Sequence, residues 1–493
     1  MMSVEMNERK NYTAALIGAG EEALHAVRCA AEMGIRTVAL DKNPGAAAMF
    51  EASKALPIDI SDADAVVEAL REEKADFILP APVGRFVTTW GRVNDALGLR
   101  GVSEDAALKC ADKWRFHETL HKAGLRNAEC VLLPAGEQEN LLTKLAAQKF
   151  AKDDESAAGW LPEGSSLADS RIFCRLAGSG ETGERFSAIL KPRFGSGSRG
   201  VSSVESPEEL RKLLSESADE DLILEEEVPG REYGADGAII DGKFYLILLR
   251  KKLNTEKPVR QALGYFTEYN EGLNAAAKEL LTKIAEALGI RDSLFHADLM
   301  LREGSGEGEP EFFPIEVSCR PSGHYLHDVF TPLATGVDMI KEYIRFQTLC
   351  RSGQFSGNAE SGSGLIAADS HENTGVSAGL SGDRGWNFTP GCSKRLLIRF
   401  LDLPSGIVQY VPQYHELDFP DGISMRMMRC GIHPGDRIGS VTDGHSLIGR
   451  GYLILENERG PEEKLMADGL TVSEKRLLMT AEDVLAAFVV REE

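Results

Sequence analysis

The chain has 493 residues, 43% of them hydrophobic and 27% charged, which is enough for about three or four structural units. Its formal net charge is −22, and this acidic field argues against nucleic acid as a partner because it repels phosphate backbones. The longest apolar runs, such as FYLILL at 244–249, have the length of a strand and are too short to cross a membrane.

Eight cysteines are scattered along the chain without a C-x-x-C pair. Metal sites and disulfide frameworks need clustered ligands or a small secreted chain, so we expect free thiols in a reducing compartment. The segment MMSVEMNERKNY is polar and mixed in charge, unlike the apolar region of a signal peptide. These features predict a cytoplasmic protein that does not insert into a membrane.

Strand and helix patterns alternate between residues 12 and 102. Apolar runs of strand length occur in TAALIGA, RTVALD and DFILPAP, and amphipathic helix patterns occur in EEALHAVRCAAEMG, DADAVVEALREEKA and VTTWGRVNDALG. This order predicts a small parallel βαβ domain at 1–103. A helical stretch at 103–124 is expected to begin a new unit at about residue 104.

The rest of the chain has a less regular pattern. Residues 151–187 are rich in Gly, Ser and charge and are interpreted as an insertion, and 186–350 mix short strands with helices. A Gly/Ser-rich stretch predicts a linker at 351–364, followed by a strand-rich C-terminal subdomain at 365–493 that ends in a helix at 480–492. We therefore expect a multidomain protein of mixed α/β and α+β class, with its second domain at 104–350.

An N-terminal glycine turn has the parts of a dinucleotide site. Gly18-Ala-Gly20-Glu-Glu-Ala23 follows a predicted strand and opens a helix, and Asp41 ends the next strand, where an acid would bind ribose. NAD(P) binding is one interpretation. The other is that a tight βα turn needs glycine for backbone reasons alone.

A second glycine turn, Gly195-Ser-Gly-Ser-Arg-Gly200, spells the dinucleotide fingerprint but lies in a different context. The following residues, VSSVES, are strand-like, and a helix pattern begins only at Pro207. A dinucleotide loop must open a helix, and a Walker A loop places its lysine after the glycines, whereas Lys191 precedes them. The pattern predicts a strand–loop–strand flap over nucleotide phosphates, with a solvated surface hairpin as the alternative.

Two carboxylates occupy the middle of predicted apolar strands. Asp298 lies in SLFHADLM and Glu316 in EFFPIEVS, with Arg320 four residues further on. A buried carboxylate needs a cation, and Mg²⁺ prefers one or two carboxylates together with phosphate oxygens. The alternative is a buried ion pair with Arg320 or Arg302.

Between about residues 12 and 345, a set of segments and their order along the chain resemble the ATP-grasp superfamily, in its carboxylate–amine ligase branch. The set comprises the glycine-turn βαβ domain, Lys113 in CADKWRF, Lys191 before the flap, the segment LEEEVPGREY, Asp298, and the "E-x-N-x-R-x-x-G"-like EVSCRPSG. The resemblance implies an ATP-grasp fold with a βαβ pre-grasp domain. It also implies a flap-bearing lobe at about 120–227, with the insertion at about 151–184. The C-terminal segment PGDRIGSVTDGHSLIGRGYLILENERGPEE is similar to L-amino-acid ligases and relatives of biotin carboxylase.

The resemblance also implies a role for each matching residue. Lys113 and Lys191 correspond to the lysines that hold the ATP phosphates, and Lys191 and Arg320 to catalytic groups, Arg320 steadying an acyl phosphate. The flap that covers the phosphates comprises Gly195, Ser196, Gly197, Ser198 and Gly200. The adenine and ribose contacts are Glu225, Val228 and Glu232, and the metal ligands are Asp298, Glu316 and Ser318. The chain departs from the family pattern at Ser318, where Asn is usual, and at Asp298, where Glu is frequent.

Substrate contacts are expected from two further segments. One is a basic cluster, which stands out because the protein as a whole is acidic. The cluster residues predicted to contact substrate are Arg250, Lys252 and Arg260. The other follows Arg320 and includes Ser322 and His324. The alternatives are a solvated basic loop and polar side chains that satisfy local hydrogen bonds.

The expected function is an ATP- and Mg²⁺-dependent ligase, with Mn²⁺ as a substitute metal, that joins a small acid to an amine. An amino acid is the expected acyl donor, and the expected assembly is a homodimer. Two alternatives remain at this point: an NAD(P)-dependent oxidoreductase using the N-terminal turn, and a nucleotide-binding module without catalytic activity.

Overall fold

The structure is a computed structural model of the whole chain. It describes residues 11–126, 128–136, 138, 172, 175–176, 187–195, 199–217, 219–255, 261–302, 311–352, 386–441, 447, 449–459, 464–466 and 468–491. Several predicted features lie outside the described residues: Ser196, Gly197, Ser198 and Arg260, and most of the insertion and the linker.

The N-terminal domain is built on a four-stranded parallel sheet with the order β3-β2-β1-β4. Its strands are β1 (Thr13–Ile17), β2 (Arg36–Leu40), β3 (Lys54–Leu56) and β4 (Phe77–Ile78), and its helices are α1 (Leu24–Glu32), α2 (Ala63–Glu72) and α3 (Val87–Leu97). The predicted alternation of strands and helices is confirmed. Gly18 has a φ of +91°, and a Cβ there would lie 2.8 Å from Val83 Cγ1, so the first turn requires glycine for backbone reasons.

A second lobe follows the helices α4 (Glu104–Ala111) and α5 (Lys113–Lys122). Its antiparallel sheet has the order β5-β8-β6-β7, with strands β5 (Cys130–Leu133), β6 (Ala188–Pro192), β7 (Ser202–Val204) and β8 (Leu222–Glu226). The apolar face of α8 (Pro207–Glu216) packs on this sheet through Leu210 and Leu214. β6 and β7 pair antiparallel around the glycine segment, so the predicted strand–loop–strand hairpin is confirmed. Gly200 closes this hairpin with a φ of +71°.

An eight-stranded sheet forms the centre of the molecule, in the order β13-β12-β9-β10-β11-β14-β18-β16. Its strands are β9 (Gly230–Ile240), β10 (Lys243–Asn254), β11 (Ala262–Glu268), β12 (Ser293–Arg302), β13 (Phe312–Ser318), β14 (Arg395–Phe400), β16 (Ile423–Cys430) and β18 (Gly451–Asn457). The last three belong to the C-terminal region, and β11 pairs with β14. The expected C-terminal subdomain therefore continues the sheet of the preceding domain.

The remaining elements complete the core and the C-terminal region. They are α9 (Glu271–Leu288), α10 (Thr331–Thr335), α11 (Met339–Ser352), β15 (Gly406–Tyr410), β17 (Arg437–Ile438), α13 (Val472–Ala486) and β19 (Val489–Arg491). The predicted C-terminal helix at 480–492 is wrong in its bounds. The helix begins earlier because Thr471 and Glu474 form a capping box, and it ends at Ala486, before the chain enters β19.

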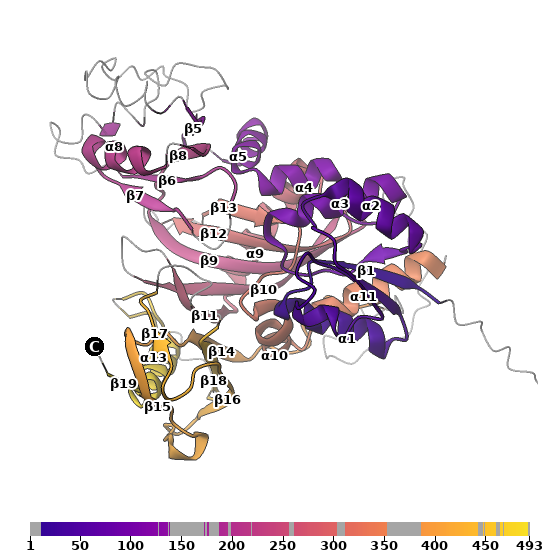
Figure 1. Cartoon of the computed structure of the whole chain (residues 1–493). Coiled ribbons are helices and arrows are strands. Elements are labelled where there is room, and N and C mark those ends of the chain that lie inside the picture. The colour runs from indigo at the N-terminus through magenta and orange to yellow at the C-terminus, as the bar shows by residue number, and fades with distance from the viewer. Residues whose placement is uncertain are drawn as a thin grey trace, which may run out of the picture.

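The arrangement of these parts is visible in Figure 1. The lobe with β5, β6, β7, β8 and α8 stands over the end of the large sheet formed by β13, β12 and β9, and the N-terminal domain lies beside that sheet. The β15, β17 and β19 sheet lies with α13 at the opposite end. None of the helices in the described part of the chain combines the length and apolar composition that a membrane crossing requires.

Candidate active site

A cavity of about 270 Å³ opens between the β5–β8 lobe, the large sheet and the N-terminal domain. Most of the predicted site residues line it, although they come from segments more than 200 positions apart. They are Lys113, Lys191, Gly195, Glu225, Val228, Glu232, Lys252, Asp298, Glu316, Ser318, Arg320, Ser322 and His324. Gly200 and Arg250 do not line the cavity.

Two buried lysines line the cavity near Gly195. Lys113 is the first residue of α5, and its Nζ donates to the carbonyl oxygen of Gly195 at 2.9 Å. Lys191 lies on β6, and its Nζ is 2.5 Å from Glu225 Oε1. Burial lowers the pKa of Lys113, and the neighbouring Lys191 charge lowers it further, against the attraction of Glu316. Both ammonium groups are thus held by the protein's own oxygens in a site that suits phosphate oxygens.

Glu225 is the centre of a buried charge cluster. Besides the contact with Lys191, its carboxylate accepts a hydrogen bond from Arg126 Nη2 at 2.7 Å, and His117 Nε2 lies 2.9 Å away. Burial opposes ionisation of Glu225, but Lys191, Arg126 and His117 together hold its pKa well below the usual range. Burial and the Arg126 charge in turn lower the pKa of His117 to about 3, so this histidine is neutral at pH 7.

The segment between β8 and β9 crosses from the lobe to the large sheet. Glu226 N–H donates to Glu129 and Glu227 N–H to Ser187, which fixes the start of the crossing. Val228 follows in the cavity wall, and within the described part of the chain its N–H has no backbone acceptor. A peptide group in this position suits the edge of a purine ring.

Lys252 on β10 lies between two acidic side chains. Its Nζ is 2.9 Å from Asp298 Oδ2 and 3.7 Å from Glu232 Oε2. Burial disfavours the ammonium form, but Asp298 and Glu232 outweigh it and raise the pKa of Lys252. The same ion pair lowers the pKa of Asp298 against the effect of burial. Lys252 is therefore a permanent cation in the cavity wall.

The two predicted metal-binding acids face each other across neighbouring strands. Asp298 on β12 and Glu316 on β13 are register partners in an antiparallel pair, which places both side chains on one face of the sheet. Asp298 Oδ1 is buried without a hydrogen-bond partner in the described structure, whereas Oδ2 holds Lys252. Ser318 lies two residues beyond Glu316 and lines the same cavity. This oxygen set fits the preferences of Mg²⁺.

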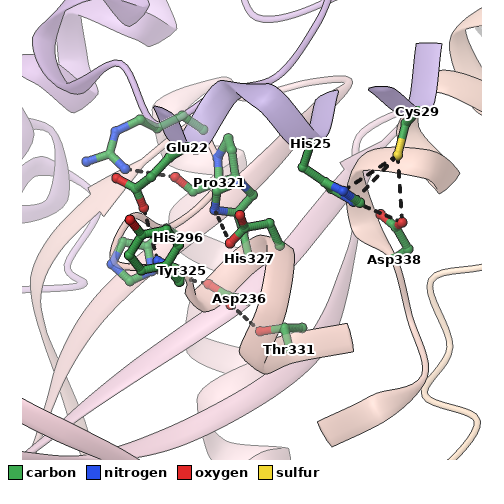
Figure 2. A network of polar contacts seen from close by, with 12 residues as sticks. Glu22, His25, Cys29, Asp236, His296, Pro321, Tyr325, His327, Thr331 and Asp338 are labelled. Atoms are coloured by element: carbon green, nitrogen blue, oxygen red, sulfur yellow. Dashed lines mark hydrogen bonds and ion pairs between the residues drawn. The ribbon is translucent and has the colours of Figure 1, made fainter. Parts of the chain in front are cut away.

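The far end of the cavity lies under the N-terminal turn. Arg320 is oriented by its own chain, with Nη1 donating to Pro321 O at 2.8 Å. Glu22 reaches into the same end, where its Oε1 accepts the Tyr325 N–H at 3.0 Å (Figure 2). Burial raises the pKa of Glu22, although His327 and the Tyr325 N–H oppose that rise. A carboxylate and a guanidinium thus stand in one wall of the cavity.

Arg250 was expected to contact substrate, but the structure does not bring it to the cavity. It is 0% exposed and makes a bidentate ion pair with Asp236, which also accepts Thr331 Oγ1 at 2.7 Å. A buried carboxylate at this place in β9 requires a permanent cation opposite it. Arg250 therefore neutralises Asp236 inside the protein, and we do not retain it as a substrate contact.

The N-terminal turn also differs from the dinucleotide interpretation. Asp41, the expected ribose acid, accepts the Ala19 N–H at 2.9 Å and the Asn43 N–H at 2.9 Å. Both oxygens of the Asp41 carboxylate therefore accept backbone hydrogen bonds, and these bonds hold the turn against the end of β2. The structure therefore gives Asp41 a structural role.

Several residues of the site could not be selected from the sequence. Arg126 and His117 precede the flap by more than 60 positions and reach Glu225 only through the packing of α5 on the lobe. His296 lies two residues before Asp298, with Nε2 3.6 Å from Asp298 Oδ1. That i, i+2 spacing on one strand face is the one signal that could have identified it.

Comparison with known proteins identifies the architecture. A family model described as ATP-grasp domain matches residues 184–327. Formate-dependent phosphoribosylglycinamide formyltransferase of Syntrophotalea carbinolica is 25% identical over 316 residues, covering 62% of this chain and 68% of that protein. The fold is similar to that of L-amino acid ligase from Bacillus licheniformis, with a TM-score of 0.65 at 14% identity over 98% of this chain and 100% of the other.

Another structure with a similar fold was determined with a nucleotide. The biotin carboxylase domain of the Hydrogenobacter thermophilus 2-oxoglutarate carboxylase, determined with MgADP, ADP and bicarbonate, gives a TM-score of 0.57 at 16% identity. The match covers 98% of this chain and 91% of that one. The resemblance inferred from the sequence and the expected fold class are confirmed.

The neutral, buried state of His117 predicts a distinct pH dependence of stability. Between about pH 3 and pH 6.5 the unfolded chain takes up a proton on this histidine that the folded chain does not, so stability falls as the pH is lowered. This single group contributes a slope of about 1.4 kcal/mol per pH unit. Thermal melts of the wild type and His117→Gln from pH 7 to pH 5 measure it.

The glutamine is polar and of similar size but does not titrate, so the melting temperature of the variant should fall less steeply with acid than that of the wild type. Glu225 titrates below pH 5, the lower limit of these melts, because its pKa is held well below the ordinary value of 4.5. If the melting temperatures of the two proteins fall in parallel as the pH is lowered, the assignment of His117 as a buried, neutral histidine is contradicted.

Proposed function

We propose that this chain, which has the ATP-grasp fold and carries an ATP-grasp domain at 184–327, is an ATP- and Mg²⁺-dependent carboxylate–amine ligase. It activates a carboxylate as an acyl phosphate and joins it to an amine, giving an amide, ADP and phosphate. One observation carries the proposal: two buried lysines, a facing pair of carboxylates and an arginine line a single cavity.

ATP is expected to occupy the part of the cavity beneath the flap. The adenine would lie against the Val228 segment, and Glu232 would reach the ribose. Lys113 and Lys191 would exchange Gly195 O and Glu225 for phosphate oxygens, while Arg126 and His117 continue to hold the Glu225 carboxylate. Exchange of one oxygen partner for another keeps the cost of desolvating the lysines low.

The metal is expected at the facing acids. Asp298 and Glu316, with Ser318 beside them, would hold Mg²⁺ or Mn²⁺. Asp298 Oδ1, which accepts no hydrogen bond within the described residues, fits this role. A divalent ion bound there neutralises charge on the transferred phosphoryl oxygens. Lys252 holds the second oxygen of Asp298 and so fixes the direction of the first.

The chain's own residues then account for the two steps. In the first, a substrate carboxylate oxygen attacks the γ-phosphorus and ADP leaves, while the lysines and Arg320 neutralise the spreading charge. In the second, the amine attacks the acyl carbon, the C–O bond to the phosphate breaks, and the amine loses a proton. Closure of the flap keeps water from the acyl phosphate.

The end of the cavity near Glu22 favours an amino acid as the acyl donor. Arg320 suits the carboxylate that is activated, and the Glu22 carboxylate suits an α-ammonium group. A phosphate-bearing substrate, as used by the phosphoribosylglycinamide relative, would place a second anion near Glu22. The charge of the site therefore supports an amino acid over a phosphoribosyl substrate.

Phosphate release from ATP and Mg²⁺ tests the reaction. We expect release to be stimulated by particular amino acids, singly or in pairs, and not by formate with phosphate-bearing amines. Lys191→Ala and Glu316→Ala should each lower kcat at least about 100-fold, since each removes a charge that the transition state requires. The matched controls are Lys283→Ala and Glu279→Ala, an exposed pair on α9 that should retain full activity.

ATP binding without phosphate release from any acid and amine would instead favour a non-catalytic nucleotide-binding module. Nicotinamide binding that is lost in Gly20→Val would favour the oxidoreductase alternative. Either result contradicts the ligase assignment.

A second experiment tests the role of Glu22. Glu22→Gln keeps the bond from Tyr325 N–H but removes the charge, so the KM for the amino acid should rise about 10- to 100-fold while the KM for ATP stays constant. Because burial raises the pKa of Glu22, its ionised form costs stability at neutral pH. The variant should therefore melt no lower than the wild type.

The neighbouring Glu21→Gln is the matched control, because Glu21 is exposed and pairs with Arg429. Protonation of Glu22 removes the charge proposed to bind the ammonium group. Wild-type kcat/KM should therefore fall as the pH drops through the Glu22 pKa, which lies above the ordinary value of 4.5. An unchanged amino-acid KM in Glu22→Gln contradicts the assignment of the ammonium site.

A further inference from the structure

Three side chains with metal-binding atoms meet outside the cavity, at the contact between α1 and the start of α11. They are His25, Cys29 and Asp338, and Figure 2 shows their side chains pointing toward one another, apart from the Glu22 end of the active site. None of them lines the cavity or takes part in the proposed reaction. The scattered cysteines of the sequence predicted no metal site, and the fold brings this set together from positions 313 residues apart.

Helix α1 sets the relative positions of two of the three side chains. His25 and Cys29 are four residues apart on α1, so their side chains lie on one face of the helix, one turn apart. Asp338 directly precedes Met339, the first residue of α11, and its Oδ1 accepts the Lys341 N–H at 3.0 Å. That bond orients the carboxylate and leaves Oδ2 directed at the other two residues, as an outer-shell contact does for a metal ligand.

The distances between the donor atoms match a tetrahedral site. His25 Nε2 is 3.0 Å from Asp338 Oδ2, and Cys29 Sγ is 3.5 Å from His25 Nε2 and 3.8 Å from Asp338 Oδ2. Ligands bound tetrahedrally at the usual zinc distances of ~2.0–2.3 Å lie roughly 3.3–3.6 Å from one another. An ion at the centre of this triangle would therefore reach all three atoms with sub-ångström shifts.

One rearrangement is needed. Cys29 Sγ also lies 3.9 Å from His25 Nδ1, so the sulfur stands beside the imidazole ring and outside the direction of the Nε2 lone pair. A rotation of the ring about its Cβ–Cγ bond brings the lone pair toward the common centre. The side chains of His25 and Asp338 are 29% and 28% exposed, which leaves room for this rotation and for a water as fourth ligand.

The donor set selects the ion. Thiolate and imidazole favour zinc-class ions, whereas Mg²⁺ prefers an all-oxygen site such as that of Asp298 and Glu316. A second group, His117, Cys130 and Glu225, is similarly close, but Lys191 and Arg126 already neutralise its carboxylate. It therefore lacks the negative charge that would attract a cation.

We propose that His25, Cys29 and Asp338 form a site for Zn²⁺ or a similar ion, which fastens the N-terminal domain to α11. In the metal-free protein, hydrogen bonds to Asp338 Oδ2 hold the three together. When the ion binds, Cys29 gives up its thiol proton and His25 the proton it shares with Asp338, and three metal–ligand bonds replace these contacts. Binding of the ion to the folded chain alone stabilises it.

Cobalt(II) added to the full-length protein tests the site, because a cobalt–thiolate bond produces a charge-transfer band in the near ultraviolet that oxygen ligands do not give. We expect about one equivalent of Co²⁺ to produce the band and about one equivalent of Zn²⁺ to abolish it. Zn²⁺ should also raise the melting temperature. Cys29→Ser and His25→Asn should lose the band and weaken Zn²⁺ binding at least about 10-fold.

Three variants serve as controls. Cys130→Ser and the exposed Cys392→Ser should keep the band, and so should Asp298→Asn, which alters only the cavity acids. Circular dichroism of each variant without metal confirms that it is folded. The proposal is overturned if the wild type shows no thiolate band at stoichiometric Co²⁺, or if the band survives in Cys29→Ser or is lost in Cys130→Ser or Cys392→Ser.

Discussion

The buried carboxylate of Glu225, shared by Lys191, Arg126 and His117, is the interaction on which the cleft depends. A carboxylate with 7% exposure is tolerated only when cations and donors satisfy it, and here they come from α5, the segment after it and β6. The same contacts position Lys191 for phosphate and join the lobe to the helix that carries Lys113. One charge thus links the fold of the lobe to the chemistry proposed for it.

Buried carboxylates on the strands of the large sheet are also paired with cations. Two acids of this sheet each have a cation beside them: Asp298 has Lys252, and Asp236 has Arg250. The difference between the two pairs is informative. Asp236 is saturated by Arg250 and Thr331, whereas one buried oxygen of Asp298 accepts no hydrogen bond within the described residues. A saturated pair is structural, and an unsaturated one suits a ligand.

Much of the architecture was predictable because its signals are local. The paired strands β6 and β7, the crossing at Val228 and the strands that carry Asp298 and Glu316 follow from apolar runs and glycine placement, and the structure confirms these elements. The site roles assigned to those residues remain proposals. Their side chains share one cavity, which supports the roles.

The rest depends on contacts between distant segments. Arg126, His117 and Glu22 carry no local pattern, because what makes them important is the residue they meet after folding. Arg250 illustrates the opposite case: a basic run predicted substrate contact, and Arg250 shares a strand face with Lys252. The distant Asp236 holds Arg250 in a buried ion pair, however, and only Lys252 lines the cavity. The C-terminal helix was misplaced because the Thr471 capping box outweighs the apolar run that follows it.

The central claim is that a substrate carboxylate is phosphorylated in the cleft before the amine attacks. It is tested most directly with an amino acid that supports phosphate release and carries ¹⁸O in its carboxylate, followed by mass spectrometry of the phosphate. The acyl-phosphate route transfers one carboxylate oxygen to phosphorus, so each phosphate should contain one labelled atom. Unlabelled phosphate, formed at the same rate as the amide, would contradict the account.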